Sequence, residues 1–283
     1  MRVLVTGAHG LLGSSLSRAA RERGLRVLPM GREDLDVTDR DAVEEAMSRL
    51  APDGVYNCAA FSAVDRAEAD PTDALRVNRD GPLNLARSSG SVGALLVHIG
   101  TDYVFDGRKS SPYLPEDRPG PINVYGISKL AGESAVRETG VEHLLVRTSW
   151  LFGSGGSGFV AVMSRLFSLD GPPVRVVEDE VSRPTFVGDL APALLDLVDH
   201  GARGLLHLAG GGQCTRLELA EEIRRTLGSE RGLVGVSAES YAAPARRPSY
   251  SVLDIGDACR LLGRELPHWR DALRAFLSGG GRE

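Results

Sequence analysis

A tyrosine and a lysine stand four residues apart in the segment NVYGISKLAG, as Tyr125 and Lys129. On a helix this spacing puts both side chains on one face, close enough to interact. A phenol with a pKa of about 10 is a poor proton donor or acceptor at neutral pH, but a nearby ammonium stabilises the phenolate and lowers that pKa. The pair therefore predicts a tyrosine that exchanges a proton with a carbonyl or an alcohol.

Lysine is rare in this chain, which sets Lys129 apart. Lys109 is the only other lysine among 33 basic residues, and all the rest are arginine. Lysine is a compact point charge with a tunable pKa, whereas arginine is a planar fork that stays charged. Chance alone would give the Tyr-x3-Lys spacing about 4% of the time, so the motif needs supporting context. We interpret Lys129 as retained for chemistry and Lys109 as a surface residue.

Supporting context comes from Thr101, which ends the apolar run LLVHIG. Ligands of open α/β sheets bind at the carboxyl ends of the strands. The Thr101 hydroxyl can therefore donate a hydrogen bond to the same substrate oxygen as Tyr125. A nicotinamide cofactor would supply the hydride, and the protein would supply position and the proton.

A glycine loop near the N-terminus indicates where such a cofactor binds. Gly7, Gly10 and Gly13 follow the first apolar run directly and open a helical pattern. Glycines at this point allow a tight turn and let the backbone approach a pyrophosphate, which lies on the positive end of the helix. The loop predicts dinucleotide binding.

The end of the second strand favours NADP(H), with NAD(H) possible. An acidic residue there binds the ribose 2′-hydroxyl, while an arginine accommodates a 2′-phosphate. Here the run VLPMG is uncharged at its end and is followed by Arg32. Two alternatives remain: Glu33 or Asp34 folds back onto the ribose, or Arg32 is a solvated surface charge. Asp36 is expected near the adenine, unless it caps the following helix.

The elements that must position these residues alternate in type along the first half of the chain. The runs VLVTG, RVLPMG, GVYNCAA, ALLVHIG and HLLVRTS are nearly continuously apolar, as in parallel strands covered on both faces. Helical patterns separate them, which predicts an α/β fold with a doubly wound parallel (Rossmann) sheet. We place a cofactor-binding core with the catalytic residues at 1–152. Residues 153–283 form a smaller substrate-binding part interleaved with the core.

In that second part we expect a glycine-rich connector over 153–158, helices over 217–228 and 268–277, and a loop over 240–254.

Composition narrows the class of protein and its surroundings. A net charge of −5 argues against nucleic acid as a partner. Three cysteines, scattered and without metal-ligand spacing, suggest a reducing compartment and no metal site. No apolar run approaches the ~18 residues of a membrane span, and the chain opens on a strand with no charged leader. We expect a cytoplasmic protein that needs no membrane.

Taken together, these motifs resemble the extended short-chain dehydrogenase/reductases, and within them the dTDP-4-dehydrorhamnose reductase family. The blocks that carry the resemblance span nearly the whole chain: NCAAFSAVDRAE, VNRDGPLNLA, GTDYVFDG, NVYGISKLAGE, VRTSWLFG, RPTFVGDLA, ARRPSYSVLD and HWRDALRAFL. The resemblance implies NADPH-dependent reduction of the C4 ketone of dTDP-4-dehydro-L-rhamnose to dTDP-L-rhamnose, by a monomer or homodimer acting on a dTDP-sugar.

It also implies roles for individual residues. Thr101, Tyr125 and Lys129 would be the catalytic set, and Asp102 and Tyr103 would line the sugar site. Trp150 would pack against the sugar ring, with a core aromatic at a strand end as the less favoured alternative. Diphosphate-binding candidates are Arg183, Arg246 and Arg247, since a guanidinium binds phosphate in a bidentate manner. The implied cofactor contacts are Gly7, Gly10, Leu11, Leu12, Gly13, Arg32, Asp36, Val37, Ala59, Ala60, Asn78, Tyr125 and Lys129.

The chain departs from the family pattern at three places. Gly100 stands where serine is frequent, which would remove a hydroxyl near the nicotinamide. Ser182 and Arg183 replace a small pair such as Gly-Ala. Ser15 lies in the helix where some members carry a glutamate for a magnesium-bridged dimer, so we predict neither that metal nor that dimer.

Other functions remain open to different degrees. A sugar-nucleotide 4,6-dehydratase would carry a glutamate after the Thr-Asp pair, where this chain has Tyr103. An epimerase would hold NAD tightly. A ketoreductase for another 4-keto-deoxysugar nucleotide remains possible. So does a non-catalytic NADP-binding protein resembling the regulatory subunit of methionine adenosyltransferase.

Overall fold

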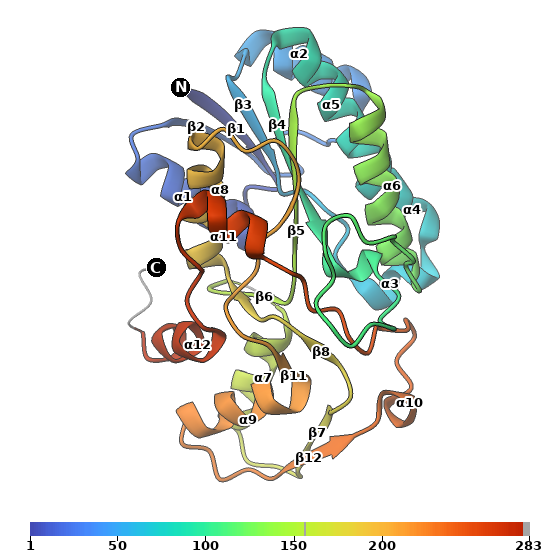
Figure 1. Cartoon of the computed structure of the whole chain (residues 1–283), viewed down its shortest axis with the longest axis vertical. Coiled ribbons are helices and arrows are strands. Elements are labelled where there is room, and N and C mark those ends of the chain that lie inside the picture. The colour runs from blue at the N-terminus through green and yellow to red at the C-terminus, as the bar shows by residue number, and fades with distance from the viewer. Residues whose placement is uncertain (156, 280–283) are drawn as a thin grey trace.

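A six-stranded parallel sheet forms the centre of the computed structural model, which describes residues 1–155 and 157–279 (Figure 1). Its strands are β1 (Arg2–Thr6), β2 (Arg26–Met30), β3 (Gly54–Asn57), β4 (Leu95–Thr101), β5 (His143–Thr148) and β10 (Gly204–His207), in the order β2-β1-β3-β4-β5-β10. The chain order reverses between β1 and β3, and at such a switch point the loops leave a crevice for a ligand.

Helices cover both faces of this sheet. One face carries α1 (Leu11–Glu22), α8 (Val187–Asp199) and α11 (Gly256–Leu262). The other carries α2 (Arg40–Leu50), α5 (Gly81–Val92) and α6 (Val124–Glu138). Apolar residues on both sides of β1, β3, β4 and β5 are buried against these helices, which explains why the runs show no alternation.

Short elements connect β3 to α5 and β4 to α6. They are α3 (Val64–Ala69), α4 (Pro71–Leu75), the π-helical turn η1 (Arg76–Asp80) and the 3₁₀ turn η2 (Asp102–Val104).

A second, smaller core lies at the carboxyl end of the sheet, at the bottom of Figure 1. Its elements are β6 (Leu151–Phe152), α7 (Phe159–Phe167), β7 (Val174–Val177), β8 (Val181–Ser182), β9 (Thr185–Phe186), β11 (Cys214–Thr215), α9 (Arg216–Thr226), β12 (Leu233–Val236), α10 (Ala238–Tyr241) and α12 (Trp269–Leu277). Here the strands pair in twos, β11 with β8, β12 with β7 and β6 with β9. Trp269 is fully buried among the apolar side chains of α7 and α9.

The α/β class, the five strands and the helices at 217–228 and 268–277 are confirmed, with ends within two residues except for β3, which ends three residues before the end of its predicted run. The expected loop over 240–254 is largely irregular, although its first two residues end α10. The connector at 153–158 lies partly outside the described residues. The boundary after residue 152 stays a prediction, and α8, β10 and α11 lie beyond it in sequence while packing on the core.

Candidate active site

The glycine loop lies between the carboxyl ends of β1 and β3. Gly7 has a φ of +62°, and a Cβ on it would stand 2.7 Å from the backbone nitrogen of Ala59. Gly13 passes so close to Gly7 that a Cβ would meet its carbonyl oxygen. Gly10 is the N-cap of α1, and no side chain there accepts a hydrogen bond from the backbone N–H groups of the helix. The first turn of α1 also holds no acidic residue. The exposed N–H groups of α1 therefore remain available to an anion, which fits a dinucleotide pyrophosphate.

The end of β2 presents Arg32 to solvent beside this loop. The Arg32 side chain is 71% exposed, and its Nε lies 4.0 Å from Asp36 Oδ2. The ring of His9, from the glycine loop, lies against Gly31, where a Cβ would be 2.4 Å from Nδ1. Sequence reasoning missed His9, which a single sequence does not distinguish from any loop histidine. The contact of Arg32 with a 2′-phosphate therefore stays a prediction, because this exposure also fits a solvated surface charge.

Asp36 closes a local turn instead of capping a helix. Its Oδ1 accepts from the Thr38 backbone nitrogen at 2.9 Å and from the Thr38 hydroxyl at 2.7 Å. Burial raises the pKa of Asp36, but the Thr38 hydrogen bonds and nearby Arg32 and Arg76 outweigh it, so the pKa is lowered. Asp39 caps α2. The helix-capping alternative for Asp36 is therefore wrong.

The residues predicted to contact the cofactor after β3 divide into two kinds. Ala59 is half-buried and Ala60 is exposed at the strand end. Asn78, on η1, is fully buried, and its amide accepts from Phe61 N at 2.8 Å and donates to Phe61 O and Ser128 Oγ at 3.1 and 2.9 Å. These bonds occupy both donors of Asn78, which fixes the loop that carries Ala59 and Ala60. Val37 is a buried core residue, and Leu11 and Leu12 begin α1.

Thr101, Tyr125 and Lys129 converge at the carboxyl end of β4. Asn123 starts α6 by accepting from Gly126 N at 2.7 Å, and glycine at 126 lets the helix approach the Tyr103 carbonyl. Lys129 is 3% exposed, and its Nζ donates to Ile99 O at 2.6 Å. An ammonium has three donors, so two remain for a ligand.

The pKa values at this site follow burial. Burial raises the pKa of Tyr125, a hydrogen bond with Thr101 opposes it, and the charge of Asp102 adds to it. The expected lowering of the Tyr125 pKa by Lys129 is therefore wrong, because the ammonium is directed at Ile99 O. Burial also lowers the pKa of Lys129 to about 8, against the opposing charge of Glu133.

Asp102 has a different task from the predicted one. The side chain is 2% exposed, and its Oδ2 accepts from Ser182 Oγ at 3.0 Å and Ser251 Oγ at 2.5 Å. The Thr101 hydroxyl donates to Oδ1 at 3.2 Å. Burial raises the pKa of Asp102 to about 6, and these hydroxyl hydrogen bonds limit the rise. Asp102 ties β4 to the smaller core, and the departure at Ser182 supplies one of the ties.

Two aromatic contacts involve residues predicted to line the sugar site. Trp150 has a φ of +43°, which is strained for a bulky residue. The guanidinium of Arg216 stacks on its ring, 3.5 Å from the centroid, and lies 3.7 Å from Glu180. Tyr103 meets Tyr125 edge to face with the centroids 5.8 Å apart. Sequence reasoning missed Arg216, because nothing in one sequence separates it from the other arginines.

The three predicted diphosphate-binding arginines prove unequal. Arg183 donates to the carbonyl oxygens of Leu253 and Gly212 at 2.8 and 3.0 Å, so its fork holds backbone and the prediction for it is not supported. The Arg246 side chain is exposed. Arg247 pairs with Asp65 at 2.8 Å. Burial lowers the pKa of Arg247, but the Asp65 hydrogen bond and the charges of Tyr103, Asp65 and Glu180 outweigh it, so the pKa is raised.

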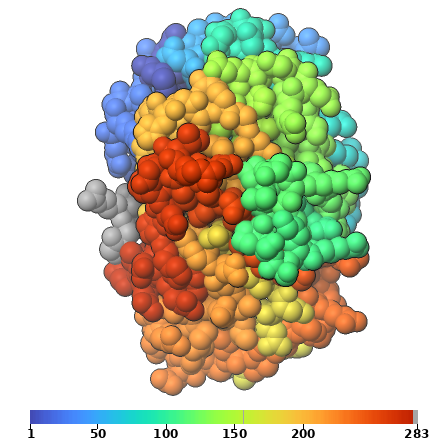
Figure 2. Space-filling view, in the orientation of Figure 1, coloured from blue at the N-terminus to red at the C-terminus, as the bar shows by residue number. Residues whose placement is uncertain are grey.

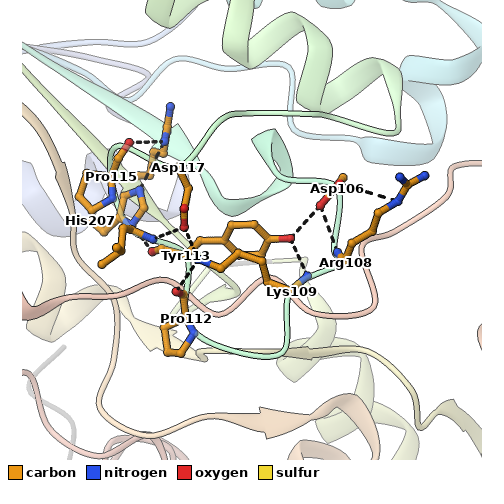
Figure 3. A network of polar contacts seen from close by, with 10 residues as sticks. Asp106, Arg108, Lys109, Pro112, Tyr113, Pro115, Asp117 and His207 are labelled. Carbon is orange, nitrogen blue, oxygen red and sulfur yellow. Dashed lines mark hydrogen bonds and ion pairs between the residues drawn. The ribbon is translucent and has the colours of Figure 1, made fainter.

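The Lys109 side chain is 33% exposed, so it lies at the surface as expected, but it makes specific contacts there. Its ammonium lies 2.5 Å from Asp117 Oδ2 and 5.2 Å from the centre of the Tyr113 ring (Figure 3). The Tyr113 hydroxyl donates a hydrogen bond to Asp106 at 2.8 Å. The backbone of Tyr113 forms a parallel β-bridge with Leu253, in the C-terminal part of the chain. The loop from η2 to α6 thus lies on the C-terminal segment, and Figure 2 shows the two, green and red, side by side.

Gly100 faces away from the predicted hydroxyl position. A Cβ there would lie 2.6 Å from Glu133 Oε1 and 2.9 Å from Arg147 Cγ. A serine at 100 would therefore meet this buried pair, so the expected loss of a hydroxyl near the nicotinamide does not apply.

Within residues 1–155 and 157–279, no group of three His, Cys, Asp or Glu side chains is placed to hold a metal ion. No helix among them is long and apolar enough to cross a membrane. The cysteines, Cys58, Cys214 and Cys259, are all free.

Comparisons with known proteins agree with this geometry. The family model described as "RmlD substrate binding domain" matches residues 1–280. A dTDP-4-dehydrorhamnose reductase of Mycolicibacterium smegmatis is 41% identical over 96% of this chain and 84% of its own length. A dTDP-4-keto-6-deoxy-D-glucose reductase of Streptomyces niveus is 40% identical over 96% and 95%. The crystal structure of dTDP-4-dehydrorhamnose reductase from Bacillus anthracis in complex with NADP superposes with a TM-score of 0.94, at 35% identity over 98% and 99%.

Proposed function

The chain belongs to the dTDP-4-dehydrorhamnose reductase family, and we propose that Thr101, Tyr125 and Lys129 carry out its reaction at the carboxyl end of β4. The reaction is NADPH-dependent reduction of the C4 ketone of dTDP-4-dehydro-L-rhamnose. The observation that carries the proposal is the convergence of these three side chains beside a glycine loop whose α1 N–H groups are free.

The cofactor would lie across the β1/β3 switch point. Its pyrophosphate would meet the N-terminus of α1, Arg32 would receive the 2′-phosphate, and the free donors of Lys129 would hold the nicotinamide ribose. When bound, NADPH supplies the hydride that C4 accepts.

Tyr125 supplies the proton. A reductase needs a neutral phenol to protonate the developing alkoxide, and the raised pKa of Tyr125 keeps the phenol protonated at neutral pH. Thr101 holds the phenol by a hydrogen bond. Lys129 would hold a positive charge at the end of β4, which favours a transition state that gains negative charge there.

The sugar nucleotide would lie over Trp150, Tyr103 and Arg216. The Arg216 guanidinium, stacked on Trp150, and Arg247, held by Asp65, are the cations that face this side. They would bind the diphosphate, a role that planar forks suit. We propose a monomer or a homodimer in the cytoplasm, a compartment that the free cysteines suit.

A second substrate is favoured by a specific observation, since the relative from Streptomyces niveus is named for dTDP-4-keto-6-deoxy-D-glucose. NADPH oxidation, followed with both 4-keto sugar nucleotides and with both nicotinamide cofactors, tests the proposal. We expect the highest kcat/KM with dTDP-4-dehydro-L-rhamnose and NADPH. A higher value with the glucose-derived ketone would assign the second substrate. No turnover with either, together with tight NADP binding, would favour a non-catalytic partner protein.

A further inference from the structure

Helix α6 carries a third ionisable side chain in line with the proposed catalytic pair. Tyr125, Lys129 and Glu133 follow at intervals of four residues, so they share one face of the helix. Glu133 is 2% exposed, and Lys129 is 3% exposed. A carboxylate buried to this degree is costly unless it is paired and hydrogen-bonded.

Arg147 of β5 supplies that pairing. Its Nη2 lies 2.7 Å from Glu133 Oε2, and its Nε lies 3.1 Å from each carboxylate oxygen. The remaining nitrogen, Nη1, lies 3.4 Å from both Pro115 O and His207 Nε2. The Glu133 carboxylate is therefore fixed in position.

The end of β4 is shaped to admit this arrangement. Ile99 gives its carbonyl oxygen to Lys129, Gly100 leaves space for Glu133 and Arg147, and Thr101 belongs to the proposed catalytic set. Three successive residues of β4 thus determine where the Lys129 ammonium, the Glu133–Arg147 ion pair and the Thr101 hydroxyl lie.

Glu133 is the anion that acts on Lys129. Burial raises the pKa of Cys58 and lowers that of His98, so both are neutral near pH 7. Of the groups that act on the pKa of Lys129, Glu133 is the strongest that favours the charged form. The titratable and charged groups around Lys129 are Cys58 after β3, His98 on β4, Tyr125 and Glu133 on α6, and Arg147 on β5.

We propose that Glu133 is a positioning residue for the reduction: gripped by Arg147, its carboxylate keeps the Lys129 ammonium charged and directed at the end of β4. This inference rests on the proposed function of Lys129. The inference goes beyond that function by naming the residue that keeps Lys129 charged.

The chain offers a direct test because it has only two lysines. Protein labelled with ¹³C and ¹⁵N in lysine gives one side-chain signal each for Lys109 and Lys129, and Lys109→Arg assigns them. In Glu133→Gln we expect the Lys129 titration midpoint to fall by about one pH unit or more, because an anion one helical turn away on the same face is lost. The Lys109 midpoint should stay unchanged.

Matched variants separate this effect from a loss of packing. Glu222, on α9, is another buried glutamate, and it pairs with Arg274 of α12 at 2.7 Å. Glu222→Gln should leave the titration midpoint of Lys129 unchanged. Glu133→Asp keeps the charge one methylene further away and should give a smaller fall. If Glu133→Gln does not fold, Glu133→Asp decides the matter, and a midpoint equal to the wild type overturns the proposal.

Activity provides the second readout. The charged lysine is required, so in Glu133→Gln the basic limb of kcat/KM against pH should move to lower pH in step with the NMR midpoint. An unmoved NMR midpoint overturns the inference, whatever the activity. Because the NMR titration needs no turnover, a midpoint shift without any ketone reduction would leave the inference intact and count against the proposed function instead.

Discussion

Replacing Asp102 by asparagine should change how the stability of the protein depends on pH. Asp102 is buried, and its pKa rises from the ordinary 3.8 to about 6. Between these values the native state holds a proton that the unfolded state has released, so stability falls as pH rises from about 4 to about 6 and then levels off. A difference of about two pH units corresponds to about 3 kcal/mol. The wild type therefore bears that cost at neutral pH, and Asp102→Asn does not.

Urea denaturation at several pH values measures the effect. We expect the unfolding free energy of Asp102→Asn, relative to the wild type, to rise by about 3 kcal/mol between about pH 4 and about pH 7. Ser251→Ala removes a hydrogen bond that stabilises the carboxylate, so it should enlarge the fall in stability with pH. Ser249→Ala serves as the control, because that exposed hydroxyl donates to Gly107 O and not to Asp102. A difference between Asp102→Asn and the wild type that is the same at every pH would refute the reasoning.

Three further predictions concern the ligands. Tyr125→Phe removes the proposed proton donor and should lower kcat by about 10²–10⁴ while NADPH binding, followed by fluorescence, stays nearly unchanged; unaltered turnover would contradict the assignment. Arg32→Asp should move cofactor preference towards NADH by at least about tenfold in the ratio of kcat/KM values, and an unchanged ratio would exclude Arg32 from phosphate recognition. Arg216→Ala should raise KM for the sugar nucleotide by about 5–30-fold and leave the NADPH dissociation constant unchanged. Arg225→Ala, which changes an exposed residue on the same helix, should leave both constants unchanged. An equal rise of KM in the two variants would argue against a role for the stacked cation.

The core of the fold could be predicted because parallel strands buried on both faces are uniformly apolar. Leu4, Val55 and Leu96, inside three of these runs, are fully buried, and the continuous apolar pattern alone identifies the strands. The strand β10 escaped notice because it has only four residues and lies between two loops. Its place at the edge of the sheet depends on pairing with β5, a contact between distant parts of the sequence.

The site was predictable where a motif fixes the backbone and unpredictable where side chains meet across the fold. Gly7 is required by its positive φ and Gly13 by a close approach within the same loop, so their spacing identifies them. Arg183 and Arg216 show the opposite case. Arg183 donates its hydrogen bonds to backbone carbonyl oxygens, whereas Arg216 stacks on Trp150. Only these tertiary contacts distinguish the two arginines.

The electrostatics of Tyr125 were misjudged for a similar reason. The spacing to Lys129 gives proximity on a helix, but the direction of the ammonium is set by Ile99 O on another element. Burial then dominates the phenol. A sequence motif predicts which residues share a face, whereas the pKa depends on what covers that face.

The central claim is that this chain transfers a hydride from NADPH to C4 of dTDP-4-dehydro-L-rhamnose and that Tyr125 supplies the proton. The most direct measurement uses NADPH carrying deuterium at the transferred position, with NMR of the sugar nucleotide produced. We predict deuterium at C4 of the product with the wild type and almost no product in the same time with Tyr125→Phe. Absence of deuterium from C4, or equal product from the variant, would contradict the account.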